Sequence, residues 1–151
     1  MQRAIEPVEI REIESGAENR SQTLKVVVTE DTEIIKTILS SLGDEEKRTI
    51  LDVVIDQPKT IFEIFEICGI PQTTAYRKIM ALIQDGLLIE DGSSSKHGYK
   101  SVPRYAPAFD SIVIKMDKNK TFLQLGIVSR LVPKNSILQR IKNSDLTEAI
   151  A

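Results

Sequence analysis

The sequence of 151 residues contains one cysteine, one histidine and no tryptophan. Cys68 alone cannot form a disulfide within the chain, and Cys68 with His97 is too small a ligand set for a zinc site in one protomer. No apolar run approaches the roughly 18 residues needed to cross a bilayer. Residues 1–16 are acidic and interrupted by polar side chains, unlike a signal peptide. We expect no metal site, no membrane partner and a cytoplasmic protein.

Catalytic signatures are also missing from the sequence. There is no Gly-rich phosphate loop and no nucleophile elbow, and a single histidine is available as a conventional general base. We therefore expect a protein that is not an enzyme and that carries no cofactor.

Neither positive nor negative charge dominates the composition. The formal net charge is −2, which gives no overall attraction to a polyanion. The distribution is uneven, because residues 44–56 are rich in acids whereas bases outnumber acids over residues 72–105. In that second segment the bases are Arg77, Lys78, Lys96, Lys100 and Arg104, and the acids are Asp85, Glu90 and Asp91. A surface that faces a nucleic acid would have to come from residues 72–105.

What is present is typical of a globular protein, with 41% hydrophobic and 28% charged residues in a length that suits one domain. Residues 1–22 are rich in Glu, with scattered Ser and Asn, and are expected as a flexible N-terminal arm. Residues 23–107 start with a short β-branched strand at 24–28 and continue with helices. Residues 108–151 are expected as a β-hairpin and a helix, with dimerisation as one interpretation.

Two helices are expected before residue 58. Asp31 or Thr32 can cap the first, whose apolar residues recur at helical spacing until Gly43. Asp44 caps the second in the same way, and Pro58 stops it.

A further pair of short helices is joined by a tight turn. The first of this pair starts at Thr60 and carries a narrow apolar stripe. The stripe consists of Ile61, Ile64, Phe65 and Cys68. Cys68 is therefore a small buried hydrophobe or, as the alternative, a redox or effector site. Gly69 ends this helix and Pro71 starts the next, a pattern typical of a helix-turn-helix.

The helix expected over about 71–85 has two different faces. Its inward stripe consists of Ala75, Ile79, Leu82 and Ile83. Hydrogen-bonding side chains crowd its first two turns, the part of a recognition helix that reaches base edges in the major groove. They are Gln72, Thr73, Thr74, Tyr76 and Arg77. A helix that only packs would also need a polar outer face, but more usually one of Lys and Glu.

A β-hairpin is expected after this helix. Residues 87–90 and 99–105 read as two strands around the turn DGSSSKHG. Such a wing, over about 88–105, would bring positive charge to the phosphates beside the groove. The candidate contacts are Lys96, Lys100 and Arg104. His97 at the tip reads more simply as a solvated loop residue.

Roughly residues 44–107 resemble the winged helix-turn-helix of ArsR-type transcriptional regulators, particularly archaeal ones. The resemblance is carried by the segment DEEKRTILDVVIDQPKTIFEIFEICGIPQTTAYRKIMALIQDGLLIEDG. The expected fold is α+β, a winged helix-turn-helix domain with an extra C-terminal β-hairpin and a short terminal helix. The resemblance implies two groups of DNA contacts. On the recognition helix these are Gln72, Thr73, Thr74, Tyr76 and Arg77, and on the wing or backbone Lys96, Lys100 and Arg104.

Two features depart from this family. Pro71 stands where the family often has a serine that caps the recognition helix, so that capping contact should be lost. Metal-sensing members place a cysteine in a segment like FEICGI, but here Cys68 lacks a second thiol. A metal response is therefore not carried over.

The C-terminal third is expected to form two strands, 111–116 and 121–128, around the turn 117–120. A two-stranded hairpin is marginal alone. It could add strand 24–28, pair with the same hairpin of a second protomer, or cover the first helix. A within-chain sheet and a dimer, which would suit a two-fold DNA site, are equally open.

The last short helix is expected over 133–141, capped by Asn135 or Ser136. Residues 115–151 carry more bases than acids, which could add phosphate contacts or form a solvated basic face.

Two functions of different class fit these features. The first is a sequence-specific, double-stranded DNA-binding transcriptional regulator that works as a homodimer. The alternative is a winged-helix module that binds another protein, which the sequence pI of about 5.5 favours. The operator sequence, the direction of regulation and any small-molecule effector are not encoded in recognisable form.

Overall fold

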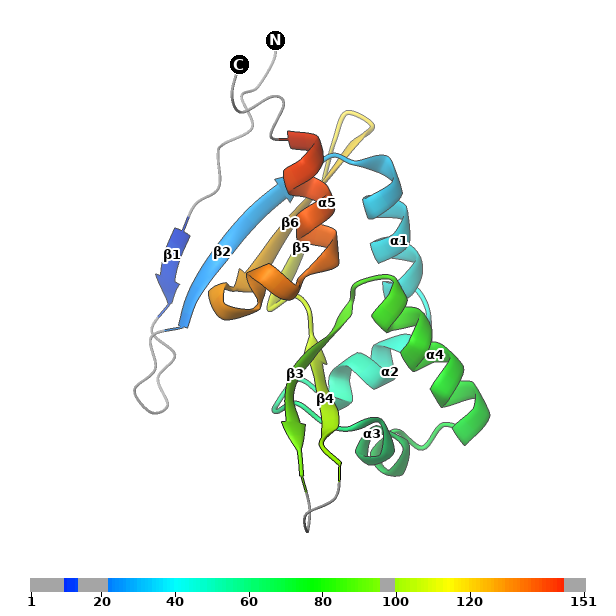
Figure 1. Ribbon diagram of the computed structural model, residues 1–151. Helices are drawn as coiled ribbons and strands as arrows, with labels where there is room; N and C mark the ends of the chain where they lie inside the picture. The colour runs from blue at the N-terminus through cyan, green and yellow to red at the C-terminus, as the bar shows by residue number, and fades with distance from the viewer. Residues whose placement is uncertain (1–9, 14–21, 96–99, 146–151) are drawn as a thin grey trace. The chain divides into compact units, whose positions relative to one another are not determined.

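The computed structural model describes residues 10–13, 22–95 and 100–145 (Figure 1). The chain forms two compact units. Unit 1 consists of Met1–Ile35 and Phe109–Ala151, and unit 2 of Lys36–Ala108. The division falls inside helix α1 (Thr32–Leu42), whose start is capped by the carboxylate of Asp31.

Unit 1 contains an antiparallel four-stranded sheet built from both ends of the sequence (Figure 1). Its strands are β1 (Ile10–Ile13), β2 (Gln22–Thr29), β6 (Lys120–Val128) and β5 (Ser111–Asp117), in that spatial order. β2 and β6 pair in register from Leu24 opposite Val128 to Thr29 opposite Leu123. The within-chain alternative for the C-terminal hairpin is thus confirmed for β6.

The core of unit 1 follows from the two-residue period of β6. Leu123, Leu125 and Ile127 are fully buried, as expected when alternate side chains share one face of a sheet. After β6 the chain enters a 3₁₀ turn, η1 (Ser129–Lys134), which contacts β2 and β6. Helix α5 (Ser136–Asp145) follows.

The last helix begins three residues after the start of the expected range 133–141, directly after Asn135, which is confirmed as its cap. Pro133 lies inside η1, and the side-chain oxygen of Asn135 accepts the N–H of Leu138 at 2.9 Å. The cap therefore sets the start of α5 after Asn135, because a capping side chain satisfies a free N–H of the first turn.

After the part of α1 that belongs to it, residues 36–42, unit 2 contains three helices followed by a two-stranded hairpin. The helices are α2 (Glu45–Val53), α3 (Ile61–Cys68) and α4 (Gln72–Gln84), and the strands are β3 (Leu88–Ser94) and β4 (Val102–Pro107). The three helices pack on one another, and α4 also contacts β3. Fully buried side chains from all three helices form the core. They are Ile50, Ile64, Ala75, Ile79 and Leu82.

The expected cap of α2 is confirmed, and the helix expected to start at Thr60 begins one residue later, with Thr60 as its cap. Asp44 accepts the backbone N–H of Lys47 at 3.0 Å, and Thr60 accepts that of Glu63 at 3.2 Å. Three helices, a tight turn between the last two and a hairpin directly after them make unit 2 a winged helix-turn-helix within an α+β chain.

Three boundaries differ from the sequence-based division. Within the expected arm of residues 1–22, Ile10–Ile13 form β1, which pairs with the start of β2. The strand expected at 24–28 leads residues 23–107 in sequence, but it belongs to unit 1, because its partner β6 lies near the other end of the chain. β3 reaches Ser94 because a register shift between Glu90 and Ser93 lets the pairing continue past Gly92.

Candidate nucleic-acid interface

The turn into α4 is set by one glycine and one proline. Gly69 follows α3 with φ 69° and ψ 9°, a left-handed conformation that glycine adopts easily because it has no Cβ. Pro71 is the N-cap of α4 and makes no side-chain capping hydrogen bond. The expected loss of that contact is confirmed.

The two faces of α4 differ as the sequence predicts. Ala75, Ile79 and Leu82 are fully buried, and Ile83 is half-buried. The opposite face is exposed and carries Thr73, Tyr76, Arg77, Met80 and Gln84. Gln72 at the start of the helix is exposed as well, whereas Thr74 is half-buried. Apart from Thr74, the predicted side chains of the first two turns are brought together on accessible surface.

Tyr76 on α4 is braced by Phe65 on α3. The centroids of their rings lie 6.4 Å apart and the ring planes are tilted by 52°, a favourable arrangement for two aromatic side chains. Tyr76 remains 52% exposed. The contact limits the orientations of the ring while leaving about half of the residue open to a ligand. The sequence pattern places Phe65 in the apolar stripe of α3 but does not indicate this pairing.

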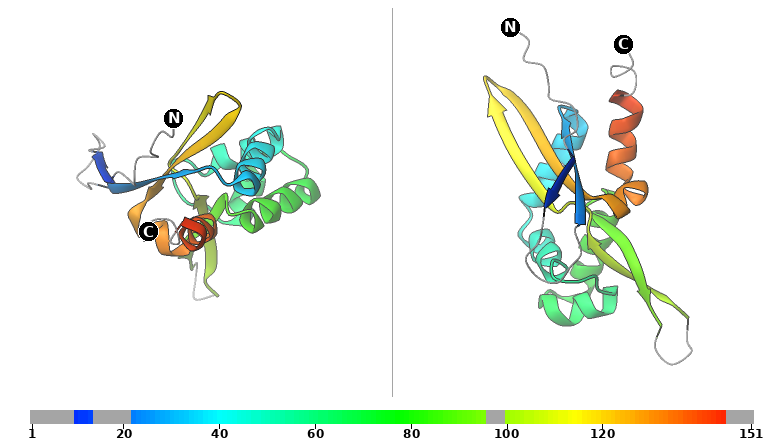
Figure 2. Two further views of the ribbon diagram at one scale, coloured as in Figure 1. Left: turned by 90° about the horizontal axis from the view of Figure 1, so that it is seen from above. Right: turned by 90° about the vertical axis from the view of Figure 1, so that its left-hand side faces the viewer.

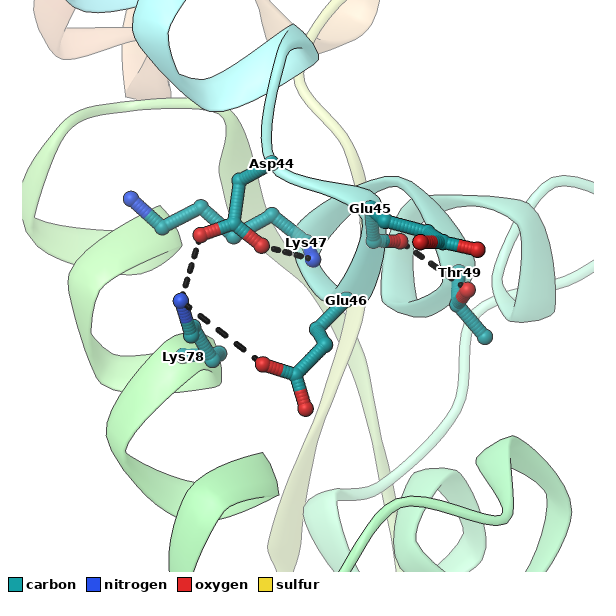
Figure 3. A network of polar contacts seen from close by, with 6 residues as sticks. All are labelled: Asp44, Glu45, Glu46, Lys47, Thr49 and Lys78. Carbon is teal, nitrogen blue, oxygen red and sulfur yellow. Dashed lines mark hydrogen bonds and ion pairs between the residues drawn. The ribbon is translucent and has the colours of Figure 1, made fainter.

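An ion-pair network ties α4 to the start of α2 (Figure 3). The ammonium of Lys78 binds Oδ2 of Asp44 and lies 3.9 Å from Oε1 of Glu46. The other carboxylate oxygen of Asp44 accepts the N–H of Lys47. One carboxylate therefore caps α2 and anchors α4.

The same contacts shift the titration of Asp44. The hydrogen bond from Lys78, followed by that from the backbone N–H of Lys47, holds the pKa of Asp44 below its ordinary value of 3.8, because both stabilise the charged carboxylate. In the sequence, Asp44 is recognisable as a helix cap and Lys78 as a base on α4, but nothing in their spacing indicates that they pair. From the sequence alone, Lys78 is only one of the bases of residues 72–105.

Lys59, in the connection between α2 and α3, was also missed. Its backbone forms two hydrogen bonds with Tyr105 of β4, at 3.0 and 2.8 Å, so the connection adds a short bridge beside the hairpin. Its ammonium donates to the carbonyl of Val53 at 2.7 Å, where a positive charge is favoured by the negative end of α2. Lys59 thus joins the helices to the base of the wing.

The predicted wing contacts fall into three groups. Lys100 is exposed just before β4. Arg104 on β4 is half-buried, and its Nε is buried without a hydrogen-bond partner among the described residues. Arg104 is therefore less accessible than the sequence suggested, because β4 turns part of its guanidinium inward. Lys96 and His97 lie outside the described residues.

The described part of the chain contains no candidate metal site and no candidate membrane-spanning helix. Within it, no group of three or more His, Cys, Asp or Glu side chains is placed to hold a metal ion. None of its helices combines the length and apolar character needed to span a membrane. Cys68 is a half-buried free thiol on α3.

Two solved structures are similar to part of the chain. NolR from Sinorhizobium fredii is 17% identical over 52% of this chain and 72% of NolR, with a TM-score of 0.41. The homodimeric winged helix-turn-helix DNA-binding domain of Mb0332 from Mycobacterium bovis, described as a possible ArsR-family transcriptional regulator, is 20% identical. That match covers 50% of this chain and 65% of the Mb0332 domain, with a TM-score of 0.40. No family model and no curated protein matches the chain. The assignment of unit 2 as a winged helix-turn-helix therefore depends on the helices, turn and hairpin described above.

Proposed function

We propose that the protein is a sequence-specific, double-stranded DNA-binding transcriptional regulator that acts as a homodimer in the cytoplasm. Helix α4 enters the major groove, and the wing over residues 88–105 follows the sugar-phosphate backbone. One observation carries this proposal: Gln72, Thr73, Tyr76 and Arg77 in the first two turns of α4 are exposed, while Ala75, Ile79 and Leu82 on the opposite face are fully buried. That division lets the helix fill a groove without loosening the core.

The exposed side chains have the chemistry that base edges require. The guanidinium of Arg77 can donate two hydrogen bonds to O6 and N7 of guanine, and the amide of Gln72 can pair with N6 and N7 of adenine. The hydroxyls of Thr73 and Tyr76 suit either a base edge or a phosphate. The exposed ammonium of Lys100 supplies a phosphate contact that carries no sequence information.

The anchoring contacts of α4 support the same role. Lys78 is committed to Asp44 and Phe65 braces Tyr76, so the helix that would read DNA is held by neighbours on both flanks. A recognition surface benefits from such preorganisation, because less conformational freedom is lost on binding.

A second function is favoured by apolar residues on the surface of unit 2. Ile55, Phe62 and Ile67 are 64%, 66% and 57% exposed, and the sequence pI is about 5.5. These features suit a winged-helix module that binds another protein, since exposed apolar groups are enriched at interaction sites.

Selection of bound sequences from a random double-stranded DNA pool tests the proposal. Wild type, Arg77→Ala and Gln84→Ala are compared at near-physiological salt. Gln84 is the matched control, because it is exposed on the same helix but lies beyond the first two turns. We expect a two-fold motif with half-sites about one helical turn apart, retained in Gln84→Ala.

Arg77→Ala should lose the preference at one base position of each half-site. Because each contact contributes about 1–3 kcal/mol and the homodimer loses two of them, binding should weaken by about 2–6 kcal/mol, which is at least about 30-fold. A folded wild-type protein that enriches no motif would contradict DNA reading and favour the protein-binding module.

A further inference from the structure

The outer edge of the unit 1 sheet carries apolar side chains that the fold leaves open. β5 is the last strand of the order β1-β2-β6-β5 and pairs with β6 alone among the described strands. On β5, Val113, Ile114 and Met116 are 49%, 47% and 72% exposed. The neighbouring β6 has fully buried residues at alternate positions. Figure 2 shows the β5–β6 hairpin as a long twisted ribbon.

This edge lacks the devices that usually protect an open strand. Edge strands are kept from pairing by proline, bulges, short length or several charges. β5 has seven residues, contains no proline and keeps an unbroken register with β6 from Ser111 to Asp117. Lys115 is the one basic residue within it. By contrast, β1 at the other edge has four residues.

The turn of the hairpin determines which backbone groups of β5 face outward. Lys118 and Asn119 have φ of 48° and 69°, as a two-residue type I′ turn requires. The pair that closes such a turn, Asp117 and Lys120, is a hydrogen-bonded one. Because hydrogen-bonded and non-hydrogen-bonded pairs alternate, the backbone groups of Ile112, Ile114 and Met116 point away from β6.

These three residues define a register in which β5 of one copy can pair with β5 of a second copy. Two copies related by a two-fold axis at Ile114 pair that residue with its own counterpart and Ile112 with Met116. Apolar side chains then face apolar side chains on one face of the joined sheet, which stabilises cross-strand pairs. On the other face, Lys115 lies opposite Val113.

Neighbouring registers fit less well. An axis at Lys115 would set that ammonium directly opposite its counterpart, and like charges in this position are destabilising. An axis at Val113 would place Met116 opposite Asp110, which lies outside β5 and donates its own N–H to Gly126 at 2.7 Å. The charge of Lys115 and the start of β5 after Asp110 therefore favour the axis at Ile114.

We propose that a second copy of this chain pairs antiparallel with β5, about a two-fold axis at Ile114, to form one continuous eight-stranded sheet. The central contacts are the backbone hydrogen bonds of Ile112, Ile114 and Met116 and the apolar side chains beside them. The proposal rests on the homodimer of the proposed function and assigns the edge of β5 as the interface between its two protomers. Its test contains no DNA, so it can fail while DNA binding stands.

The test uses the full chain and sedimentation at micromolar concentrations. Wild type should be a dimer. Ile114→Lys and Ile114→Glu each place two like charges across the axis and should weaken dimerisation by at least about tenfold. Ile55→Lys is the matched control, since Ile55 is an exposed isoleucine in unit 2, and it should leave the dimer intact. Circular dichroism confirms that each variant is folded.

Mixing Ile114→Lys with Ile114→Glu tests the register itself. If residue 114 faces its counterpart, opposite charges now meet and a heterodimer should form at concentrations where each variant alone is monomeric. A monomeric wild type, or an Ile114→Lys protein that stays fully dimeric, would overturn the proposed surface. Two dissociated variants that fail to associate with each other would overturn the register at Ile114.

Discussion

Asp44 performs two structural roles that substitutions can separate. Its carboxylate caps α2 through the N–H of Lys47 and binds the ammonium of Lys78 on α4. Asparagine is as good a helix cap as aspartate but carries no charge. Asp44→Asn therefore removes the ion pair and keeps the cap, whereas Asp44→Ala removes both.

We expect Asp44→Asn to lower the free energy of unfolding by about 0.2–1 kcal/mol at pH 7, because the pair is only partly buried. Asp44→Ala should lower it by a further 0.5–2 kcal/mol or so through loss of the cap. Urea denaturation of the three proteins measures both differences. Equal stability of Asp44→Asn and Asp44→Ala would contradict the capping role.

The pH dependence of the same comparison has a definite sign. The pKa of Asp44 is lowered by folding, from an ordinary value of 3.8, so its charged form stabilises the folded state. That contribution is complete above pH 3.8 and is lost as pH falls through the lower pKa of the folded protein. The stability gap between wild type and Asp44→Asn should therefore close in acid. A gap that stays constant below pH 3 would show that Lys78 does not stabilise the carboxylate.

At the scale of elements, the wing and α4 should contribute differently to DNA binding. Phosphate contacts add salt-dependent affinity without base preference, and each one removed reduces the slope of log K against log salt by about 0.9. Since the homodimer loses one such contact from each protomer, we expect Lys100→Ala to reduce the slope by about twice this amount and to leave the selected motif unchanged. Fluorescence anisotropy titrations over a range of salt concentrations measure the slope.

Lys36→Ala is the control for the wing. Lys36 is also an exposed base, but it lies on α1 outside the helix-turn-helix and wing. Its replacement should leave the slope unchanged. An altered base preference in Lys100→Ala would mean that this segment reads bases rather than phosphates.

The elements of unit 2 could be predicted because their signals are local. Asp44 and Thr60 mark helix starts, Gly69 and Pro71 mark the turn, and the spacing of Ala75, Ile79 and Leu82 gives the buried face of α4. Each signal lies within a few residues of the feature that it determines. The accessible polar face of α4 followed from the same periodicity.

Features that depend on distant residues could not be predicted in this way. The pairing of β2 with β6 joins strands about a hundred residues apart in sequence, and several partners were compatible with the pattern of β6. The Lys78–Asp44 pair also connects two helices, and no local spacing indicates it. The partly inward position of Arg104 depends on how β4 packs, which its sequence alone does not fix.

At the scale of the whole molecule, the middle of the chain forms the winged helix-turn-helix and its two ends form the sheet unit. The segments proposed for DNA contact and for self-association are thus carried by different units. Substitutions at Arg77 and at Ile114 should therefore be separable, the first acting on base preference and the second on oligomeric state.

The net charge of −2 and the pI of about 5.5 set an expectation for the whole chain. Binding to arbitrary DNA is almost entirely electrostatic, and a slightly acidic protein gains little from it. We expect a scrambled duplex to bind with a Kd near 10⁻⁴ M at physiological salt, the weak end of the usual range of about 10⁻⁴–10⁻⁶ M. The selected sequence should bind at least about 10³-fold more tightly, because direct base contacts supply the difference. Anisotropy titrations with the two duplexes measure the ratio. A ratio below about ten would contradict base reading by α4, because each direct base contact alone contributes about 1–3 kcal/mol of discrimination and the dimer would make several of them.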